Sequence, residues 1–130
     1  MNTKRVGNGS EAWCLAKFVS LGWIVLLPFG DNERYDLVIE RGNGFETIQV
    51  KTGRLSNGCI QFNAYSSVGR VGNGTFRSYV GEVDLFAVYH DGCVYLVPVQ
   101  EVTTNKPLLR LEATKNNQRQ RVRWAKEYQI

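Results

Sequence analysis

Three polar residues, Asp36, Gln49 and Lys51, have the types and the spacing that phosphate chemistry requires. They lie in two β-prone runs joined by a Gly-Asn-Gly centre, which predicts a β-hairpin. Folding the chain at the central asparagine places Asp36 opposite Val50, give or take one position. Because side chains alternate along a strand, Gln49 and Lys51 then share a face, and the three groups gather within roughly 5–8 Å. A carboxylate for a hard metal ion beside an ammonium for a phosphate or a water predicts phosphodiester hydrolysis.

A helix is expected upstream of this hairpin, with Ser10 as its N-cap, an end near Leu21 and Gly22 as its stop. Glu11 falls in the first turn, where it can face a polar site or simply favour the helix dipole. The residues alone leave both readings of Glu11 open. Apolar residues at helical spacing predict the buried stripe: Ala12, Leu15, Ala16 and Val19.

The rest of the chain predicts a mixed β-sheet between helices. The expected strands cover residues 23–28, 35–40, 45–52, 59–63, 83–89, 93–97 and 108–112. Residues 64–80 are rich in Gly, Ser and Tyr without a clear period, and predict a long loop or an interrupted hairpin. A terminal helix is expected over 118–128. This order of elements indicates an α/β fold.

With Glu11 on a helix ahead of Asp36 and the Gln49-Val50-Lys51 triplet, the chain resembles the PD-(D/E)XK nuclease superfamily. Within that superfamily it is similar to the small intron-associated homing endonucleases of the cyanobacterial group I intron type. Further matching segments are Pro28-Phe29-Gly30-Asp31-Asn32, Tyr35-Asp36-Leu37, Gln49-Val50-Lys51-Thr52-Gly53-Arg54, Leu85-Phe86-Ala87-Val88-Tyr89 and Tyr95-Leu96-Val97-Pro98-Val99. The resemblance implies a restriction-endonuclease-like core, a mixed β-sheet flanked by helices. It also implies a single nuclease domain over residues 1–130, with a basic C-terminal segment, 113–130.

The same resemblance implies roles for the site residues. Glu11 and Asp36 would bind Mg²⁺ with the carbonyl of Val50 as a neutral ligand, and Lys51 would orient or deprotonate the attacking water. Gln49 would assist, although it stands where the superfamily usually has an acid. An amide oxygen can bind Mg²⁺ or hold a water, but it supplies no negative charge. An active site is therefore expected, and a catalytically inactive DNA-binding module is the alternative.

The basic residues are distributed as a polyanionic partner requires. The net charge is +4, from 16 Lys+Arg against 12 Asp+Glu, and no acid lies between Glu46 and Glu82. The expected DNA-facing residues in this interval are Arg54, Tyr65, Arg70, Phe76, Arg77 and Tyr79. A second basic set, in the tail, would hold flanking phosphates or form a subunit interface: Lys115, Arg119, Arg121, Arg123 and Lys126.

The cysteines and the apolar runs bear on location. Cys14, Cys59 and Cys93 are odd in number and form no C-x-x-C motif, which predicts reduced thiols in a cytoplasmic protein. The longest apolar run, 23–27, is too short to cross a bilayer, and no signal peptide is recognisable. We therefore expect no membrane partner.

The expected function is site-specific cleavage of double-stranded DNA by an intron homing endonuclease that uses Mg²⁺. Because the strands of a duplex are antiparallel, cutting both requires two sites related by twofold symmetry, so we expect a homodimer. The resemblance suggests a homotetramer as well. The closest alternative enzyme is a structure-selective nuclease of the Holliday-junction-resolvase kind, which would share the site and cut branched DNA.

Overall fold

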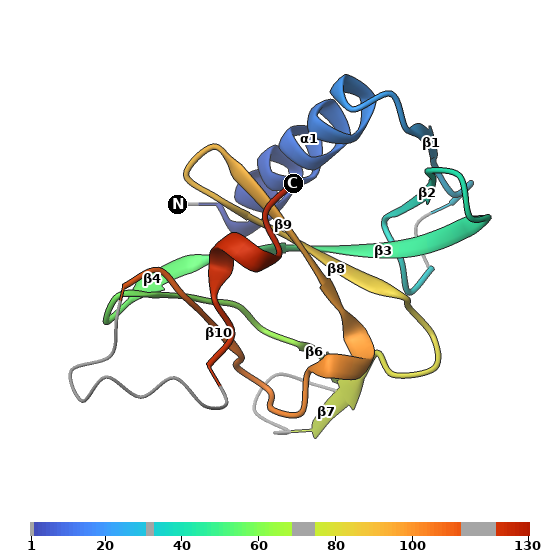
Figure 1. Ribbon diagram of the computed structural model, residues 1–130. Coiled ribbons are helices and arrows are strands. Elements are labelled where there is room, and N and C mark those ends of the chain that lie inside the picture. Colours follow the sequence, from blue (N-terminus) through green and yellow to red (C-terminus); the bar gives the residue numbers. More distant parts are fainter. Residues whose placement is uncertain (1, 31–32, 69–74, 113–121) are drawn as a thin grey trace.

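The computed structural model describes residues 2–30, 33–68, 75–112 and 122–130. A five-stranded sheet in the order β1-β2-β3-β8-β9 lies at its centre. Its strands are β1 (Ile24–Leu26), β2 (Leu37–Glu40), β3 (Phe45–Thr52), β8 (Leu85–His90) and β9 (Cys93–Pro98). Strands β3 and β8 run parallel and the other neighbours run antiparallel. The sheet is therefore mixed, and with helix α1 (Thr3–Ser20) packed across it the α/β class is confirmed (Figure 1).

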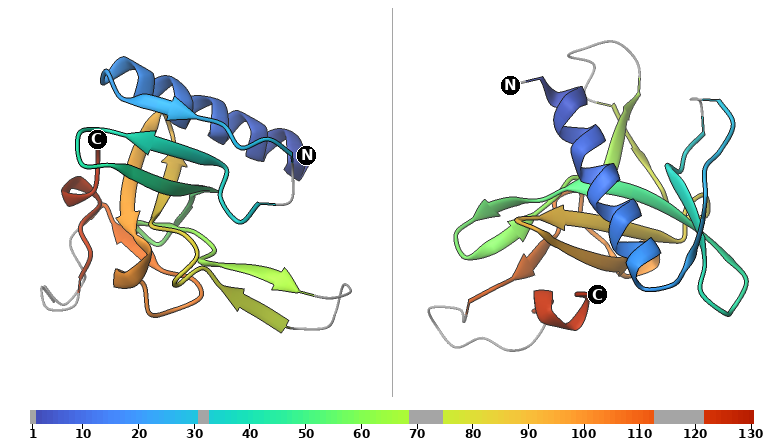
Figure 2. Two further views of the ribbon diagram at one scale, coloured as in Figure 1. Left: turned by 90° about the vertical axis from the view of Figure 1, so that its right-hand side faces the viewer. Right: turned by 90° about the horizontal axis from the view of Figure 1, so that it is seen from above.

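Two smaller sheets lie on the side of the central sheet away from α1 (Figure 2). One has the order β10-β5-β4, and the other is the hairpin β6-β7. Their strands are β4 (Arg54–Ser56), β5 (Cys59–Gln61), β6 (Tyr65–Val68), β7 (Thr75–Ser78) and β10 (Leu108–Arg110), and the 3-10 turn η1 (Val99–Glu101) follows β9. Each face of the central sheet thus has its own core. Phe18, Leu37 and Val50 belong to the core under α1, whereas Phe62 and Phe86 belong to the other.

Helix α1 begins earlier than the sequence predicted. Its N-cap is Asn2, whose side chain accepts hydrogen bonds from the backbone N–H groups of Lys4 and Arg5. The predicted stop at Gly22 is confirmed, because Gly22 follows the C-cap with a φ of 82°. Ser10 is therefore a mid-helix residue rather than a cap.

The buried stripe of α1 also differs from the prediction. Ser10, Cys14 and Phe18, each four residues apart, are the buried residues of the helix. Val19, a residue of the predicted stripe, is 58% exposed. The predicted stripe was offset because a polar residue, Ser10, occupies one of the three buried positions, whereas Ala12 and Ala16 are exposed.

Most of the predicted β-structure is confirmed. The hairpin β2–β3 pairs Leu37 with Ile48, and the hairpin β8–β9 turns at Asp91-Gly92, where both residues have positive φ. In the ambiguous segment 64–80, β6 pairs with β7 in a hairpin.

The predicted terminal helix, 118–128, is not an α-helix in its described part, where η2 (Ala125–Glu127) is a single 3-10 turn. The chain then runs along β9: the N–H of Leu96 bonds to the carbonyl of Tyr128, and the N–H of Ile130 bonds to that of Val94. Backbone pairing to the edge of the sheet therefore replaces the expected last turns of helix.

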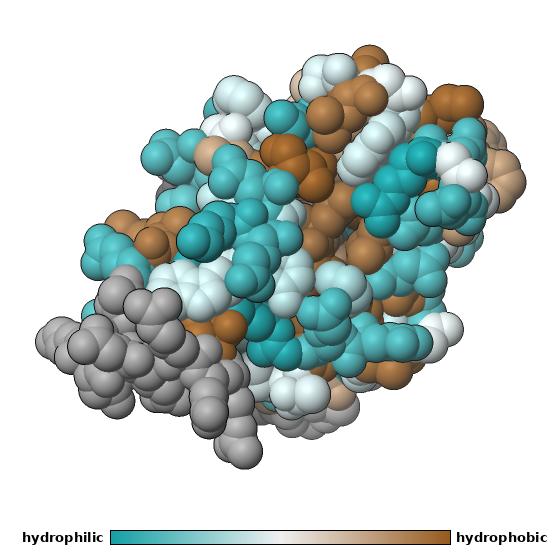
Figure 3. Space-filling model, in the orientation of Figure 1, coloured by the Kyte–Doolittle hydropathy of each residue, from teal (hydrophilic) through white to brown (hydrophobic). Residues whose placement is uncertain are grey.

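Apolar side chains gather over the C-terminal end of α1 and over β1 (Figure 3). Leu21 and Leu26 are 42% and 43% exposed, and Ile24 is 56% exposed. Strand β1 is an edge of the central sheet. Within the described ranges, no helix is long and apolar enough to cross a membrane.

Candidate active site

Asp36 directly precedes β2 and is hydrogen-bonded to β3 through both its backbone and its side chain. Its backbone N–H donates to the carbonyl of Ile48 at 2.8 Å, and its Oδ2 accepts from the N–H of Val50 at 2.9 Å. The β2–β3 pairing, continued by one residue, places Asp36 opposite Gln49. The sequence predicted Val50 as the opposite residue, give or take one position, so the prediction is correct within that margin. In an extended strand the N–H and C=O of one residue point the same way, so the carbonyl of Val50 also points toward the Asp36 side.

Glu11 approaches the same place from α1. The hydroxyls of Ser10 and Thr52 lie 2.6 Å apart and fix the helix over the end of β3. Glu11 and Asp36 line one pocket of about 310 Å³ between α1 and the segment that leads into β2. Glu11 lies in the third turn of the helix, and the first turn contains no acid. Glu11 is therefore too far from the start of α1 to stabilise the helix dipole. Of the two interpretations of this residue, a role in the polar site remains.

The electrostatics of this pocket are those of two carboxylates in a partly dry setting. Burial raises the pKa of Asp36, although the hydrogen bond from Val50 and the charge of Lys51 both lower it. Burial also raises the pKa of Glu11, and the charge of Asp36 raises it further. One turn along the helix, burial and these two charges raise the pKa of the Cys14 thiol to about 12. The pocket thus disfavours added negative charge and favours a cation.

The donor set fits a divalent ion that prefers oxygen. The carboxylates of Glu11 and Asp36 and the carbonyl of Val50 are hard oxygen ligands of the kind Mg²⁺ takes. Across the described part of the chain, no group of three His, Cys, Asp or Glu side chains is arranged to bind a metal. A bound ion would therefore depend on neutral oxygens, from Val50 or from the amide of Gln49, as well as on the two acids.

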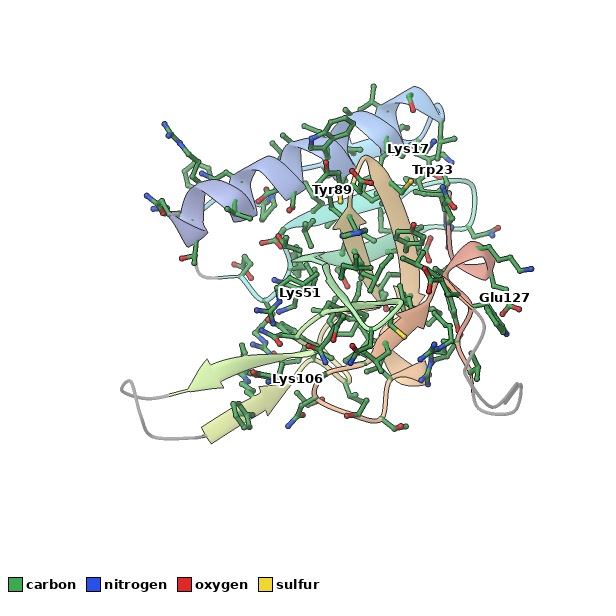
Figure 4. The ribbon with its side chains drawn as sticks, turned by 90° about the vertical axis from the view of Figure 1, so that its left-hand side faces the viewer. Lys17, Trp23, Lys51, Tyr89, Lys106 and Glu127 are labelled. Carbon is green, nitrogen blue, oxygen red and sulfur yellow. The ribbon has the colours of Figure 1, made fainter. Side chains whose placement is uncertain are left out.

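Lys51 follows Val50 on β3, and its ammonium group is held by two acceptors. The Nζ atom donates to the carbonyl of Tyr65 at 3.3 Å and to the hydroxyl of Tyr79 at 3.2 Å. Figure 4 shows Lys51 between α1 and the β6–β7 hairpin. The charge of Lys51 lowers the pKa of Asp36, so the two groups act on each other electrostatically. The structure therefore brings Glu11, Asp36 and Lys51 together.

The residues predicted to face DNA have different surroundings. Arg54 is exposed and lines a groove with Lys51 and Tyr65. The ring of Tyr65 packs on Phe76 with 4.3 Å between centroids, and Phe76 is 52% exposed. These residues remain accessible to a substrate.

Three other predicted DNA contacts are engaged within the chain. Arg77 binds both carboxylate oxygens of Glu82, at 3.0 and 2.9 Å. Tyr79 is 4% exposed, so its ring lies in the core and does not face outward. The guanidinium of Arg123 donates to the carbonyl of Glu101. Four predicted DNA contacts lie outside the described residues: Arg70, Lys115, Arg119 and Arg121.

Two residues beside the site, Glu33 and Arg34, were not among the predicted site residues. Glu33 lines the acidic pocket with Glu11 and Asp36, and its only sequence signal is its position three residues before Asp36. Arg34 pairs with Glu82 at 3.1 Å, and its guanidinium carbon lies 4.1 Å from the centroid of the Tyr79 ring. Arg34 thus links the segment ahead of Asp36 to the β6–β7 hairpin and the turn after it.

Comparison with known proteins identifies the class to which this fold and site belong. The family model of the PD-(D/E)XK endonucleases matches residues 1–130, so the chain belongs to that family and is a DNA endonuclease. The fold is similar to the solved structure of a bacterial homing endonuclease, I-Ssp6803I. The TM-score is 0.68 at 24% identity, over 98% of this chain and 86% of that one. None of the curated proteins matches this sequence.

Proposed function

We propose that the protein is a site-specific homing endonuclease of a group I intron, which hydrolyses double-stranded DNA with Mg²⁺. The observation that carries the proposal is the convergence of Glu11, Asp36 and Lys51 at the end of β3. The homing assignment is supported by the likeness of the fold to a bacterial homing endonuclease. Residues 1–130 would form one nuclease domain with a basic extension, 113–130, and the three free thiols suit a cytoplasmic protein.

In this proposal each residue of the active site has its own role. Glu11, Asp36 and the carbonyl of Val50 would hold Mg²⁺, which when bound would polarise the scissile phosphate and make water more acidic. The ammonium of Lys51 orients the attacking water and offsets the negative charge that develops on the phosphate. The amide of Gln49 holds a water by hydrogen bonding without adding charge. The N–H of Val50 keeps Oδ2 of Asp36 in place, which fixes the orientation of a carboxylate that lines the pocket.

Self-association follows from the geometry of a duplex. Cutting two antiparallel strands requires two sites related by a twofold axis, so we propose a homodimer or a homotetramer. The exposed apolar side chains over the C-terminal end of α1 and over β1 support a contact between copies there. Sedimentation equilibrium of the wild type and of Leu26→Glu tests this contact. A monomer in both would exclude it, whereas dissociation caused by the charge would support it.

The test of the proposed function is digestion of a randomised duplex library and of a synthetic four-way junction, with Mg²⁺ or with EDTA. The wild type is compared with Lys51→Ala and with Lys17→Ala, which removes a lysine from the last turn of α1, away from Lys51 (Figure 4). We expect Mg²⁺-dependent cuts at one duplex sequence, lost only in Lys51→Ala. Cuts at the junction alone would replace homing by a resolvase-like function. Binding of DNA without cleavage of either substrate would indicate an inactive binding module.

A further inference from the structure

A second depression is lined by Lys51 and has the opposite charge character to the acidic pocket. It has a volume of about 460 Å³ and lies between the first turns of α1 and the strands that follow Lys51. Thr3, Val6 and Gly7 form its helical wall, and Lys51, Arg54 and Tyr65 lie opposite. None of the described residues that line it is acidic. We call this depression the basic groove; its charge fits a polyanion.

Gly7 is an unexpected residue for the helical wall of the groove. Glycine is the least favourable residue after proline inside a helix, because it loses the most backbone freedom. A Cβ added at Gly7 would meet no atom within 4 Å, so nothing in the described fold requires glycine there. The backbone of α1 also needs no positive φ at this position, because it is helical. Because Gly7 lines the groove and has no side chain, it leaves the backbone of α1 open to a molecule that lies there.

We propose that the basic groove receives the DNA strand next to the scissile phosphate, and that Gly7 lets this strand lie directly on the backbone of α1. This inference rests on the proposed function and adds a surface that positions the substrate. Lys51 belongs both to the groove and to the catalytic cluster, so a strand lying in the groove leads to the acidic pocket. Lys4 and Arg5, exposed in the first turn of the same helix, add positive charge to that end of the molecule.

Asn63 supplies an independent observation at the same place. It lines the basic groove, and its Oδ1 is buried without a hydrogen-bond partner among the described residues. Buried acceptors are normally paired, and the exocyclic amino group of a base is a suitable donor. Because this oxygen is buried, the side-chain amide of Asn63 has to turn toward the groove before it can accept from a base, while the cations contact the phosphates.

The test compares two substitutions that change the helix equally. Gly7→Gln and Gly9→Gln each replace a helical glycine by a better helix former, and a Cβ at either position meets no atom within 4 Å. Only Gly7 lines the basic groove. Binding of the randomised duplex library and of the four-way junction is measured in EDTA, cleavage is measured in Mg²⁺, and thermal unfolding is measured without DNA.

We expect both variants to unfold a few degrees above the wild type, because helix propensity rises in both. Only Gly7→Gln should weaken DNA binding, by about tenfold or more, and slow cleavage. Equal binding and cleavage by the two variants would overturn the role of Gly7 while leaving the proposed function intact. A wild type that neither binds nor cuts either DNA would overturn the proposed function, and this inference with it.

Discussion

The hydroxyl groups of Ser10 and Thr52 lie 2.6 Å apart, and each belongs to the chain neighbour of a residue of the candidate active site. Ser10 precedes Glu11 on α1, and Thr52 follows Lys51 on β3. Ser10 is 2% exposed, so its hydroxyl has no access to bulk water as an alternative partner. One hydrogen bond thus fixes the distance between the helix that carries the carboxylate and the strand that carries the ammonium.

Replacing Ser10 by alanine should therefore reduce stability and activity together. Loss of the bond leaves the hydroxyl of Thr52 unpaired, at a cost of about 1–2 kcal/mol in the free energy of unfolding. Urea unfolding measures this change. Ser20→Ala is the matched control, because the hydroxyl of Ser20 is exposed and donates to the carbonyl of Lys17 in its own helix. We expect the control to change stability by less than about 0.5 kcal/mol. Equal effects of the two substitutions would show that Ser10 does not anchor the helix.

Glu11→Gln should stabilise the protein in the absence of metal at neutral pH. The pKa of Glu11 is raised in the fold, so its charged form is less favourable there than in the unfolded chain. That penalty is complete above the raised pKa and disappears as the pH falls below the ordinary value of a glutamate. Because the carboxylate is partly exposed, the gain at neutral pH should be only about 0.3 kcal/mol. Thermal unfolding in EDTA across the acidic range measures it.

Addition of Mg²⁺ should make the wild type more stable than Glu11→Gln. An ion that binds the folded state raises its stability by about 2.7 kcal/mol at a hundred times its dissociation constant. The wild type should gain this stability and Glu11→Gln should gain much less. Equal gains from Mg²⁺ in both proteins would exclude Glu11 as a ligand.

Tyr79→Phe should make the ammonium group of Lys51 more mobile, because it removes one of the two hydrogen-bond acceptors and leaves the carbonyl of Tyr65. The hydroxyl of Tyr79 accepts from Nζ at 3.2 Å, and the buried ring cannot move out to contact DNA. We expect faster labelling of Lys51 by an amine reagent, read by mass spectrometry against the other lysines, and a cleavage rate about tenfold lower. Tyr95→Phe is the control, since Tyr95 is equally buried at 4% exposure. If Lys51 reacts at the same rate in both variants, Tyr79 does not hold it.

The hairpin that carries the site could be predicted because its signal is local. Gly42 and Gly44 have φ values of 117° and 91°, which few other residues adopt, and alternation then sets the faces of both strands. The predicted position of Asp36 opposite β3 was therefore correct to within one residue. A second local signal was missed: Asn57-Gly58 joins β4 to β5, and both residues have positive φ.

The start of α1 could not be predicted from its residues. Gly7 and Gly9 disfavour a helix, and Ser10 followed by an acid looks like a helix start. The helix instead begins at Asn2, whose side chain accepts from two backbone N–H groups, and it continues through both glycines. Departures of this kind, where local preference is overruled, are expected at functional surfaces.

Contacts between distant residues were also beyond prediction. Arg34 and Glu82 are 48 positions apart, and neither residue type indicates the other as a partner. The same holds for Lys51 and Tyr79, which are 28 positions apart. Tyr79 follows β7, and β7 pairs with β6, which begins at Tyr65, the other residue that binds the ammonium of Lys51. Tyr79 was accordingly read as a surface aromatic, whereas the fold places it in the core.

Gln49→Glu should change stability in opposite directions without and with metal. Gln49 lies opposite Asp36, so a second carboxylate there adds repulsion and should lower the free energy of unfolding in EDTA by about 0.5 kcal/mol. In Mg²⁺ the added charge becomes an additional ligand, and the variant should gain more stability from the ion than the wild type does. Gln61→Glu, on β5, adds the same charge elsewhere and should show no added gain from Mg²⁺. Thermal unfolding over a Mg²⁺ titration measures both the loss of stability without the ion and the gain with it. If Gln49→Glu gains no more stability from Mg²⁺ than the wild type does, Gln49 lies outside the metal site.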